Sequence, residues 1–251
     1  PGLANKVGRR DAAVVALTFP PPPLQARNGQ TVVTGLPLRA AIAELASRRA
    51  DAQGAAQARR EAAERLGVNP DAPTLLVTGG SLGALHVNES MTGAADALPE
   101  GAQVVHLTGR GKDEPVRAAV EKAGLSDRWH VIDYLTTMED ALAVADLVVC
   151  RSGAGTVAEM EALGLPCIYV PLPIGNGEQR LNAADHVAAG GAQLIDDKDF
   201  TADFVRRNVF PLLGSTRLAD MAAASQSLGR AGAARALADL ALEQVKEASN
   251  E

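Results

Sequence analysis

The sequence predicts an α/β protein built on a doubly wound parallel sheet of the Rossmann-like type. From residue 73 onward, short apolar runs alternate with helix-length segments, and this order is typical of parallel strands joined by crossover helices. The run at 147–150 is apolar throughout and rich in β-branched residues, as expected for a strand buried on both faces. The expected strands are 74–78, 103–107, 129–132, 146–150, 167–170 and 192–195, and the expected helices lie near 84–97, 113–123, 137–144, 154–163 and 179–189.

The composition describes an ordinary globular chain and argues against several classes of function. Of the 251 residues, 47% are hydrophobic but 3% are aromatic, so platforms for stacking single-stranded nucleic acid are scarce. The net charge of −6 argues against a nucleic-acid-binding protein. No apolar run approaches the length of a membrane span and no signal peptide is visible, so we expect a cytoplasmic location.

Both ends of the chain fall outside the alternation of strand and helix. Residues 14–17 form an isolated strand-like run before four consecutive prolines, and residues 31–34 form a second short strand. A lone strand cannot bury itself, so this beginning does not resemble the start of a domain. After residue 199 the pattern is helical, near 201–212, 216–228 and 230–247.

Helical patterns also precede the first strand of the predicted sheet. Pro37 is suited to begin a helix that continues over residues 40–47, with Arg39 near its first turn. Residues 50–66 are rich in Ala, Gln, Arg and Glu and contain Gly54. This composition predicts an exposed helix that is broken at the glycine.

A glycine-rich turn follows the first strand of the predicted sheet. It reads Gly-Gly-Ser-Leu-Gly-Ala over residues 79–84 and contains Gly80, Ser81 and Gly83. Glycine lets a ligand approach the backbone closely, and a serine hydroxyl can donate to a phosphate oxygen at a helix start. Such a turn can also be merely tight, so this segment alone leaves both interpretations open.

The stretch 145–159 predicts a nucleotide site in outline. A buried strand runs into a tight glycine turn and then into a helix, which leaves backbone N–H groups and the positive end of the helix dipole free for a phosphate. Thr156 and Glu159 share one face of this helix, where the carboxylate is placed to accept hydrogen bonds from the hydroxyls of a ribose. The candidate residues are Arg151, Ser152, Gly153, Ala154, Thr156 and Glu159.

Two more loops follow strands at the same edge of the predicted sheet. Tyr134, Leu135 and Met138 are suited to wall a flat base, although apolar residues of this kind more often belong to a core. A loop rich in Pro and Gly leads into a helix whose first turns carry Gln179 and Asn182. Amides three residues apart share a helix face and can read sugar hydroxyls, because each amide is both donor and acceptor.

The sequence predicts no metal site. The four histidines are scattered without metal-ligand spacing, and we interpret them as structural. Residues 197–199 match an Asp-x-Asp metal-binding pattern, but they follow the last strand and precede a helix, where Asp is expected as a turn or cap residue.

In order and spacing, these motifs resemble the carboxyl-terminal, donor-binding half of the MurG family of bacterial glycosyltransferases. The resemblance covers about residues 30–247 and implies one half of a two-domain GT-B fold. The family adds GlcNAc from UDP-GlcNAc to the 4-hydroxyl of MurNAc in lipid I, which forms lipid II for peptidoglycan. The motifs are Gly79-Gly80-Ser81-x-Gly83-Ala84, the Met138 loop, Arg151-Ser152-Gly153-Ala154-x-Thr156 with Glu159, Gly164-Leu165-Pro166 and Gln179-x-x-Asn182.

The resemblance implies a role for each motif in binding the donor. Ser81 and its glycine loop would hold the pyrophosphate, with Arg39 nearby. Leu135 would contact uracil through its backbone, and Glu159 would bind the ribose hydroxyls.

The sugar would be read by the amide of Ala154 together with Gln179 and Asn182, which would contact the hydroxyls of GlcNAc, the 4-hydroxyl included. The resemblance implies inverting chemistry without a metal or other cofactor, in which helix-terminal amides stabilise the departing UDP. No catalytic residue is expected in this chain, because the family's general base belongs to its amino-terminal domain.

The resemblance also divides the chain into three parts. Residues 1–34 would be the end of the acceptor domain and a linker, residues 35–228 the UDP-sugar-binding domain, and residues 229–251 a carboxyl-terminal helix. The family's acceptor-binding loops and histidine are missing from these residues, so we expect the chain alone to bind UDP-GlcNAc weakly without turnover. Lipid I and the peripheral contact with the cytoplasmic face of the membrane would be met mainly by the missing half.

Two other functions stay open at this point. The chain is compatible with a GT-B transferase that uses another acceptor, because Gln179 and Asn182 favour a GlcNAc-like donor but do not name the acceptor. It is also compatible with a non-catalytic UDP-sugar-binding module, such as the soluble donor-binding subunit of a related eukaryotic GlcNAc transferase. The segment 1–28 counts against a subunit, which would more naturally begin near its first strand.

Overall fold

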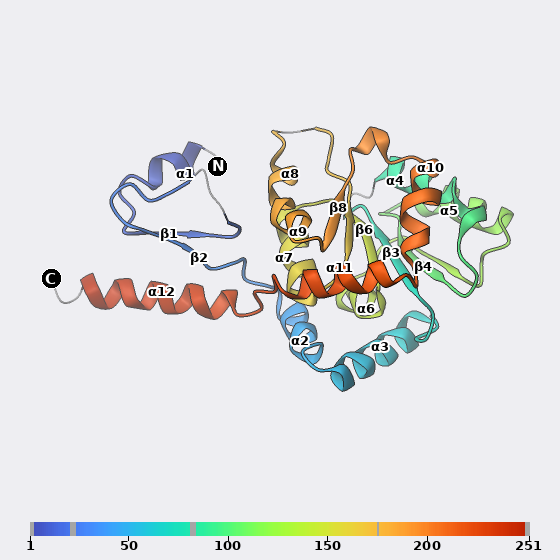
Figure 1. Cartoon of the computed structure of the whole chain (residues 1–251), viewed down its shortest axis with the longest axis horizontal. Coiled ribbons are helices and arrows are strands. Elements are labelled where there is room, and N and C mark those ends of the chain that lie inside the picture. Colours follow the sequence, from blue (N-terminus) through green and yellow to red (C-terminus); the bar gives the residue numbers. More distant parts are fainter. Residues whose placement is uncertain (1–2, 21–23, 81–83, 175, 249–251) are drawn as a thin grey trace.

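A six-stranded parallel sheet forms the centre of the computed structural model, which describes residues 3–20, 24–80, 84–174 and 176–248 (Figure 1). This arrangement confirms the predicted fold class, and each strand begins and ends within one residue of its predicted bounds. The strands are β3 (Thr74–Thr78), β4 (Gln103–Leu107), β5 (Trp129–Ile132), β6 (Leu147–Cys150), β7 (Cys167–Tyr169) and β8 (Ala192–Leu194).

The order of the strands creates a topological switch point in the middle of the sheet. In space the order is β5-β4-β3-β6-β7-β8, so the chain winds outward from β3 to one edge and then returns to β6 to wind toward the other. Leu75 to Thr78 of β3 lie opposite Leu147 to Cys150 of β6. The loops that leave β3 and β6 therefore diverge, and open α/β sheets bind ligands in the crevice that this divergence opens.

Alternate residues of the strands face two separate hydrophobic cores. Leu75 and Val149 point into one core with α4 (Leu85–Thr92), α5 (Asp113–Lys122) and α11 (Thr216–Gln226). Leu76 and Val148 point into the other core with α2 (Ala40–Arg48), α3 (Ala52–Leu66), α6 (Met138–Val144) and α7 (Ala154–Leu163). Because both faces of the sheet are covered, β6 is apolar throughout and β3 is apolar between its two terminal threonines.

The predicted break at Gly54 in the helix over residues 50–66 is wrong, although much of this helix is exposed as predicted. Helix α3 is continuous, and it buries Ala58 and two further alanines against the sheet. Gly54 lies in its first turn, where its N–H donates to the Asp51 carboxylate at 2.8 Å and completes an N-cap. A Cβ at Gly54 would lie 2.3 Å from the carbonyl oxygen of Arg48, so the glycine allows α2 and α3 to approach closely.

Two predicted helices are shorter than their apolar patterns suggest. Helix α4 ends at Thr92, and the following Gly93 lies against α10 (Ala202–Phe204), where a Cβ would come within 3.0 Å of the Cβ of Ala202. A 3₁₀ turn, η1 (Ala95–Ala97), follows it. The segment near 179–189 divides into α8 (Glu178–Asn182) and α9 (Ala184–Ala188). After α10 the chain continues through the π-helical turn η3 (Val205–Val209) and the 3₁₀ turn η4 (Phe210–Leu212).

The beginning of the chain forms a unit separate from the main sheet. After α1 (Leu3–Gly8), strands β1 (Val14–Leu17) and β2 (Gln30–Val33) pair in parallel as a two-stranded sheet. Figure 1 shows this unit to one side of the six-stranded body, with α12 (Ala233–Ala248) extending toward the same side. The division of the chain into three functional parts stays a prediction.

The two connections between the body and this side meet at one place. Gly35 has φ of +84°, and a Cβ there would lie 3.1 Å from the Cβ of Ala233. The segment that enters the body and the segment that leaves it toward α12 therefore cross in contact. None of the helices in the described ranges is long and apolar enough to span a membrane.

Candidate functional site

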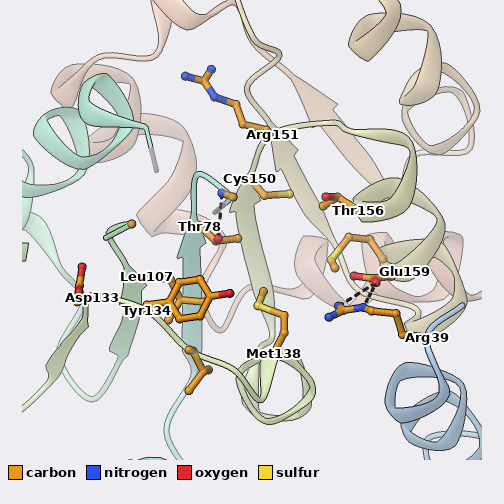
Figure 2. A pocket seen from close by; sticks show the side chains of 14 residues that line it. Arg39, Thr78, Leu107, Asp133, Tyr134, Met138, Cys150, Arg151, Thr156 and Glu159 are labelled. Atoms are coloured by element: carbon orange, nitrogen blue, oxygen red, sulfur yellow. Dashed lines mark hydrogen bonds and ion pairs between the residues drawn. The ribbon is translucent and has the colours of Figure 1, made fainter. Parts of the chain in front are cut away.

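A cleft of about 250 Å³ opens at the switch point, beyond the carboxyl ends of the central strands (Figure 2). Loops after four strands contribute to its walls, and the first turn of α2 and helix α7 close one side. Its lining residues are Arg39, Thr78, Gly80, Leu107, Gly109, Asp133, Tyr134, Leu135, Met138, Cys150, Arg151, Thr156, Glu159 and Met160. Seven of the predicted site residues line this one cleft: Arg39, Gly80, Leu135, Met138, Arg151, Thr156 and Glu159.

The glycine turn after β3 and the first turn of α7 border this cleft through Gly80 and Thr156. Gly80 has φ of +82°, which favours glycine, and its N–H donates to the hydroxyl of Thr78 at 3.3 Å. Helix α7 begins at Ala154, and no side chain caps the N-terminal residue Gly153. The amides of its first turn are thus available to an anion. The predicted residues Ser81 and Gly83 lie outside the described residues.

Glu159 and Arg39 form an ion pair at one end of the cleft. Both Nε and Nη2 of Arg39 lie 2.9 Å from Oε1 of Glu159, and Figure 2 shows the guanidinium reaching across to helix α7. The Glu159 side chain is 15% exposed and the Arg39 side chain 57%, so a largely buried carboxylate is paired with an exposed surface cation. The role of Arg39 beside the pyrophosphate stays a prediction, and in this structure the residue pairs with Glu159.

Apolar side chains wall the opposite part of the cleft. Leu107 ends β4, Tyr134 and Leu135 belong to the loop after β5, and Met138 begins α6. The guanidinium carbon of Arg110 lies 3.7 Å from the centre of the Tyr134 ring, a cation–π contact that holds the ring in place. Such a wall suits a flat heterocycle.

Arg151 lies at the other end of the cleft from Arg39 (Figure 2). Its Nη1 donates to the carbonyl oxygens of Val170 at 3.0 Å and Pro171 at 3.1 Å, and to Oδ1 of Asp197 at 2.5 Å. The second oxygen of Asp197 lies 2.9 Å from Nδ1 of His86. Burial would raise the pKa of Asp197, but the hydrogen bonds from Arg151 and His86 outweigh burial and lower the pKa below its ordinary value.

Asp197 and His86 are site residues that sequence reasoning missed. Asp197 begins the 3₁₀ turn η2 (Asp197–Asp199), which agrees with its predicted turn position, but its side chain pairs with Arg151 rather than capping a helix. His86 was interpreted as structural, and it lies in the first turn of α4 against this carboxylate. In the described ranges, no group of three or more His, Cys, Asp or Glu side chains is placed to hold a metal ion.

Beside the cleft lies a second hollow of about 420 Å³, which contains Gln179. The Oε1 atom of Gln179 accepts from the N–H of Leu172 at 2.9 Å, which fixes the loop and turns one half of the amide away from a ligand. Asp197 lines this hollow while Arg151 lines the first cleft, so their ion pair stands between the two spaces.

The remaining predicted residues support the walls rather than line them. Asn182 donates from Nδ2 to the carbonyl oxygen of Ser152 at 3.1 Å and so ties α8 to the turn before α7. Ser152 is fully buried, and its Oγ has no hydrogen-bond partner within the described part of the chain. Ser152, Gly153, Ala154 and Asn182 line neither cavity in that part.

Comparison with known proteins identifies relatives of this arrangement. Residues 74–237 match the model of the glycosyltransferase family 28 C-terminal domain. Two proteins named UDP-N-acetylglucosamine–N-acetylmuramyl-(pentapeptide) pyrophosphoryl-undecaprenol N-acetylglucosamine transferase are similar over most of the chain. The one from Bifidobacterium adolescentis is 48% identical over 226 residues, which is 84% of this chain and 57% of that protein. The one from Clavibacter michiganensis is 46% identical over 248 residues, which is 98% of this chain and 62% of that protein.

Solved structures give the same result. The crystal structure of Acinetobacter baumannii MurG is 26% identical with a TM-score of 0.74, and the match covers 96% of this chain and 63% of that one. WaaG, a glycosyltransferase of lipopolysaccharide biosynthesis, is 20% identical with a TM-score of 0.53 and shares the fold. The chain thus spans about 60% of the length of the relatives that it matches. The family model matches residues 74–237, and the similar proteins are named as transferases. The chain therefore belongs to glycosyltransferase family 28 and contains the C-terminal domain of that family.

Proposed function

We propose that this chain supplies the donor half of an inverting transfer of GlcNAc from UDP-GlcNAc to the 4-hydroxyl of MurNAc in lipid I, the step that forms lipid II. The observation that carries the proposal is the cleft at the switch point. It combines an acidic side chain on α7, uncapped backbone amides in the first turn of the same helix and an apolar wall. These three features match the ribose, the diphosphate and the base of a uridine nucleotide.

The nucleoside would lie between the apolar wall and Glu159. Uracil stacks beside Tyr134 and Met138, and the backbone of Leu135 reads its edge. The ribose hydroxyls donate to the Glu159 carboxylate, which Arg39 holds in place through Oε1. Hydrogen bonds to an ionised acceptor are about twice as strong as neutral ones, so this contact should contribute most of the nucleoside affinity.

The diphosphate would lie across the N-terminus of α7, beside the glycine turn and Arg151. As the acceptor hydroxyl attacks the anomeric carbon from the opposite side, the C1–O bond breaks and its electron pair leaves with UDP. The α7 amides and the guanidinium of Arg151 stabilise this developing negative charge, and no metal ion is needed in the proposed step.

GlcNAc would extend from the diphosphate toward the hollow that contains Gln179. Gln179 uses Oε1 to fix its own loop, and Asn182 uses Nδ2 to bind the Ser152 carbonyl. Gln179 therefore keeps Nε2 as a donor toward the hollow. Asn182 lines neither cavity in the described residues, and its free Oδ1 would accept from a sugar hydroxyl at the margin of the site.

The general base and the acceptor site would belong to the amino-terminal half of the protein. The names of the relatives given above include an undecaprenol-linked acceptor. This chain matches only part of those proteins, and its motifs correspond to the donor-binding half rather than to the half that would hold the acceptor and the general base. We propose accordingly that the whole protein works at the cytoplasmic face of the membrane as a peripheral enzyme, and that the present residues bind the donor without turnover.

Calorimetric titration of the chain with UDP-GlcNAc tests this proposal. We expect specific binding by the wild type and a loss of at least 10-fold, up to about 100-fold, in Glu159→Gln, because two charge-assisted hydrogen bonds of about 1.5–3 kcal/mol each are weakened. Glu139→Gln on the neighbouring helix α6 lies outside the cleft and serves as the matched control.

The competing interpretations predict different results in the same series. Equal affinity for UDP-glucose would remove the sugar-reading role of Gln179 and Asn182. Unchanged affinity of Glu159→Gln would remove the ribose contact, and wild-type protein that binds no UDP-GlcNAc would contradict the proposed donor site. Measurable transfer to lipid I by these 251 residues alone would contradict the assignment of the general base to another domain.

A further inference from the structure

Three loops from different parts of the sequence meet around the carboxylate of Asp197. Arg151 follows β6, Asp197 follows β8, and His86 lies in the first turn of α4. Both carboxylate oxygens are used, Oδ1 by Nη1 of Arg151 at 2.5 Å and Oδ2 by Nδ1 of His86 at 2.9 Å. The arginine and aspartate side chains are 15% and 14% exposed, so the pair is largely removed from water.

The hydrogen bonds of Arg151 fall on a single nitrogen. Nη1 donates to Asp197 and to the carbonyl oxygens of Val170 and Pro171. Because a guanidinium is a rigid planar fork, fixing one nitrogen on three acceptors fixes the direction of the whole group. Within the described residues, Nε and Nη2 have no acceptor, so two donor nitrogens are held in a set direction at the margin of the cleft.

This ion pair also separates the two cavities. Arg151 lines the cleft that we assign to the nucleotide, and Asp197 lines the hollow that contains Gln179. A sugar nucleotide that occupies both spaces must pass Arg151 with the group that joins its two parts, and in a nucleoside diphosphate sugar that group is the diphosphate.

We propose that Asp197 and His86 are positioning residues that hold Arg151 for the diphosphate of the donor. The proposal rests on the proposed function, because it presumes that a nucleotide sugar occupies the cleft. His86 donates to Asp197, Asp197 accepts from Arg151, and Arg151 presents its remaining N–H groups to the phosphate oxygens. Without this chain of contacts the long arginine side chain must be ordered by the ligand itself, which weakens binding by about 10-fold.

The decisive property is selectivity for the phosphate part of the ligand. We would measure dissociation constants for UDP-GlcNAc and UDP by calorimetry and for uridine by ligand-observed NMR, in the wild type and in variants. We expect Asp197→Asn and His86→Ala to weaken UDP and UDP-GlcNAc by about 10-fold and to leave uridine unchanged. His86→Asn places an amide N–H near the position of Nδ1 and is expected to restore most of the affinity.

Two controls make the outcome clear. Asp199→Asn changes an exposed carboxylate in the same 3₁₀ turn and is expected to bind like the wild type. His86→Ala removes a partly exposed side chain, so it remains folded and informative even if Asp197→Asn, which leaves Arg151 without its buried partner, is unstable.

Each result bears on one idea. If wild type binds UDP-GlcNAc but both variants bind UDP as tightly, the positioning role is refuted while the proposed function stands. If the variants weaken uridine as much as UDP, the network is merely structural and the proposal is again refuted. Wild type that binds neither UDP nor UDP-GlcNAc would overturn the proposed function, and the positioning role with it.

Discussion

Glu161 is expected to make the stability of the domain depend on pH in the neutral range. It lies two residues after Glu159 on α7 and therefore faces away from the cleft, toward Gly35, Leu36 and Arg230. The residue is 7% exposed, and its Oε1 has no hydrogen-bond partner in the described part of the chain. Burial raises the pKa of Glu161 from 4.5 to about 7, with a further rise from Asp185 and an opposing effect of Arg230.

The sign and size of the effect follow from this pKa. The folded state favours the protonated acid, so its contribution to stability is fully present below about pH 4.5 and is lost as the pH rises to about 7. The rise in pKa corresponds to at most about 3 kcal/mol of destabilisation once both states are ionised, and to about 1 kcal/mol at pH 5. Glutamine has nearly the same size and never ionises, so Glu161→Gln should remove this loss.

Urea unfolding, followed by circular dichroism at pH 5 and pH 8, checks the prediction. Glu161→Gln is expected to be more stable than the wild type by about 1 kcal/mol at pH 5 and by about 2–3 kcal/mol at pH 8. Glu64→Gln changes an exposed glutamate of α3 and should show no such trend. A gain that is the same at both pH values, or a loss at pH 8, would refute the reasoning.

Three other substitutions test parts of the fold. Gly54→Ala should destabilise the protein by about 2 kcal/mol despite the better helix propensity of alanine, because its Cβ would meet the Arg48 carbonyl oxygen. A higher melting temperature of the variant in thermal unfolding would contradict this. Tyr169→Phe should cost about 1–2 kcal/mol in urea unfolding, since the Tyr169 hydroxyl lies 2.9 Å from Nδ1 of buried His186, and a neutral result would exclude that bond as a stabilising one. Asp146→Asn should cost about 2–3 kcal/mol in the same assay, because it weakens a bidentate pair with an arginine of α3, and a change below 0.5 kcal/mol would argue that the pair adds nothing.

The positions of the strands could be predicted because their signal is local. Each central strand, such as β3 or β6, is buried on both faces, so its run of apolar residues is continuous and ends where the sheet ends. The loops that follow these strands then meet at one edge by topology alone. For this reason Gly80, Arg151 and Glu159 could be placed in one site without knowledge of any contact.

The contacts missed in sequence analysis all join distant segments. Arg39 and Glu159 are 120 residues apart, and Arg151 and Asp197 are 46 residues apart. An aspartate after a strand is fully explained as a turn residue, so the sequence gives no reason to expect that Asp197 also pairs with Arg151. Gly54 is a different case: its contact with the carbonyl oxygen of Arg48 is close in sequence, but it depends on how the turn sets α3 against the preceding helix, which composition does not reveal.

The crossing at Gly35 and Ala233 has a mechanical consequence. The two-stranded sheet and α12 lie to one side of the body and are joined to it by two backbone segments, which are in contact at Gly35 and Ala233. Any change in the orientation of these outer elements relative to the body must therefore be taken up by the backbone of the two segments at this crossing. Arg39 lies four residues after Gly35 and pairs with Glu159 in the cleft, so the connection that enters the body is fixed to the candidate site within about one helical turn of this crossing.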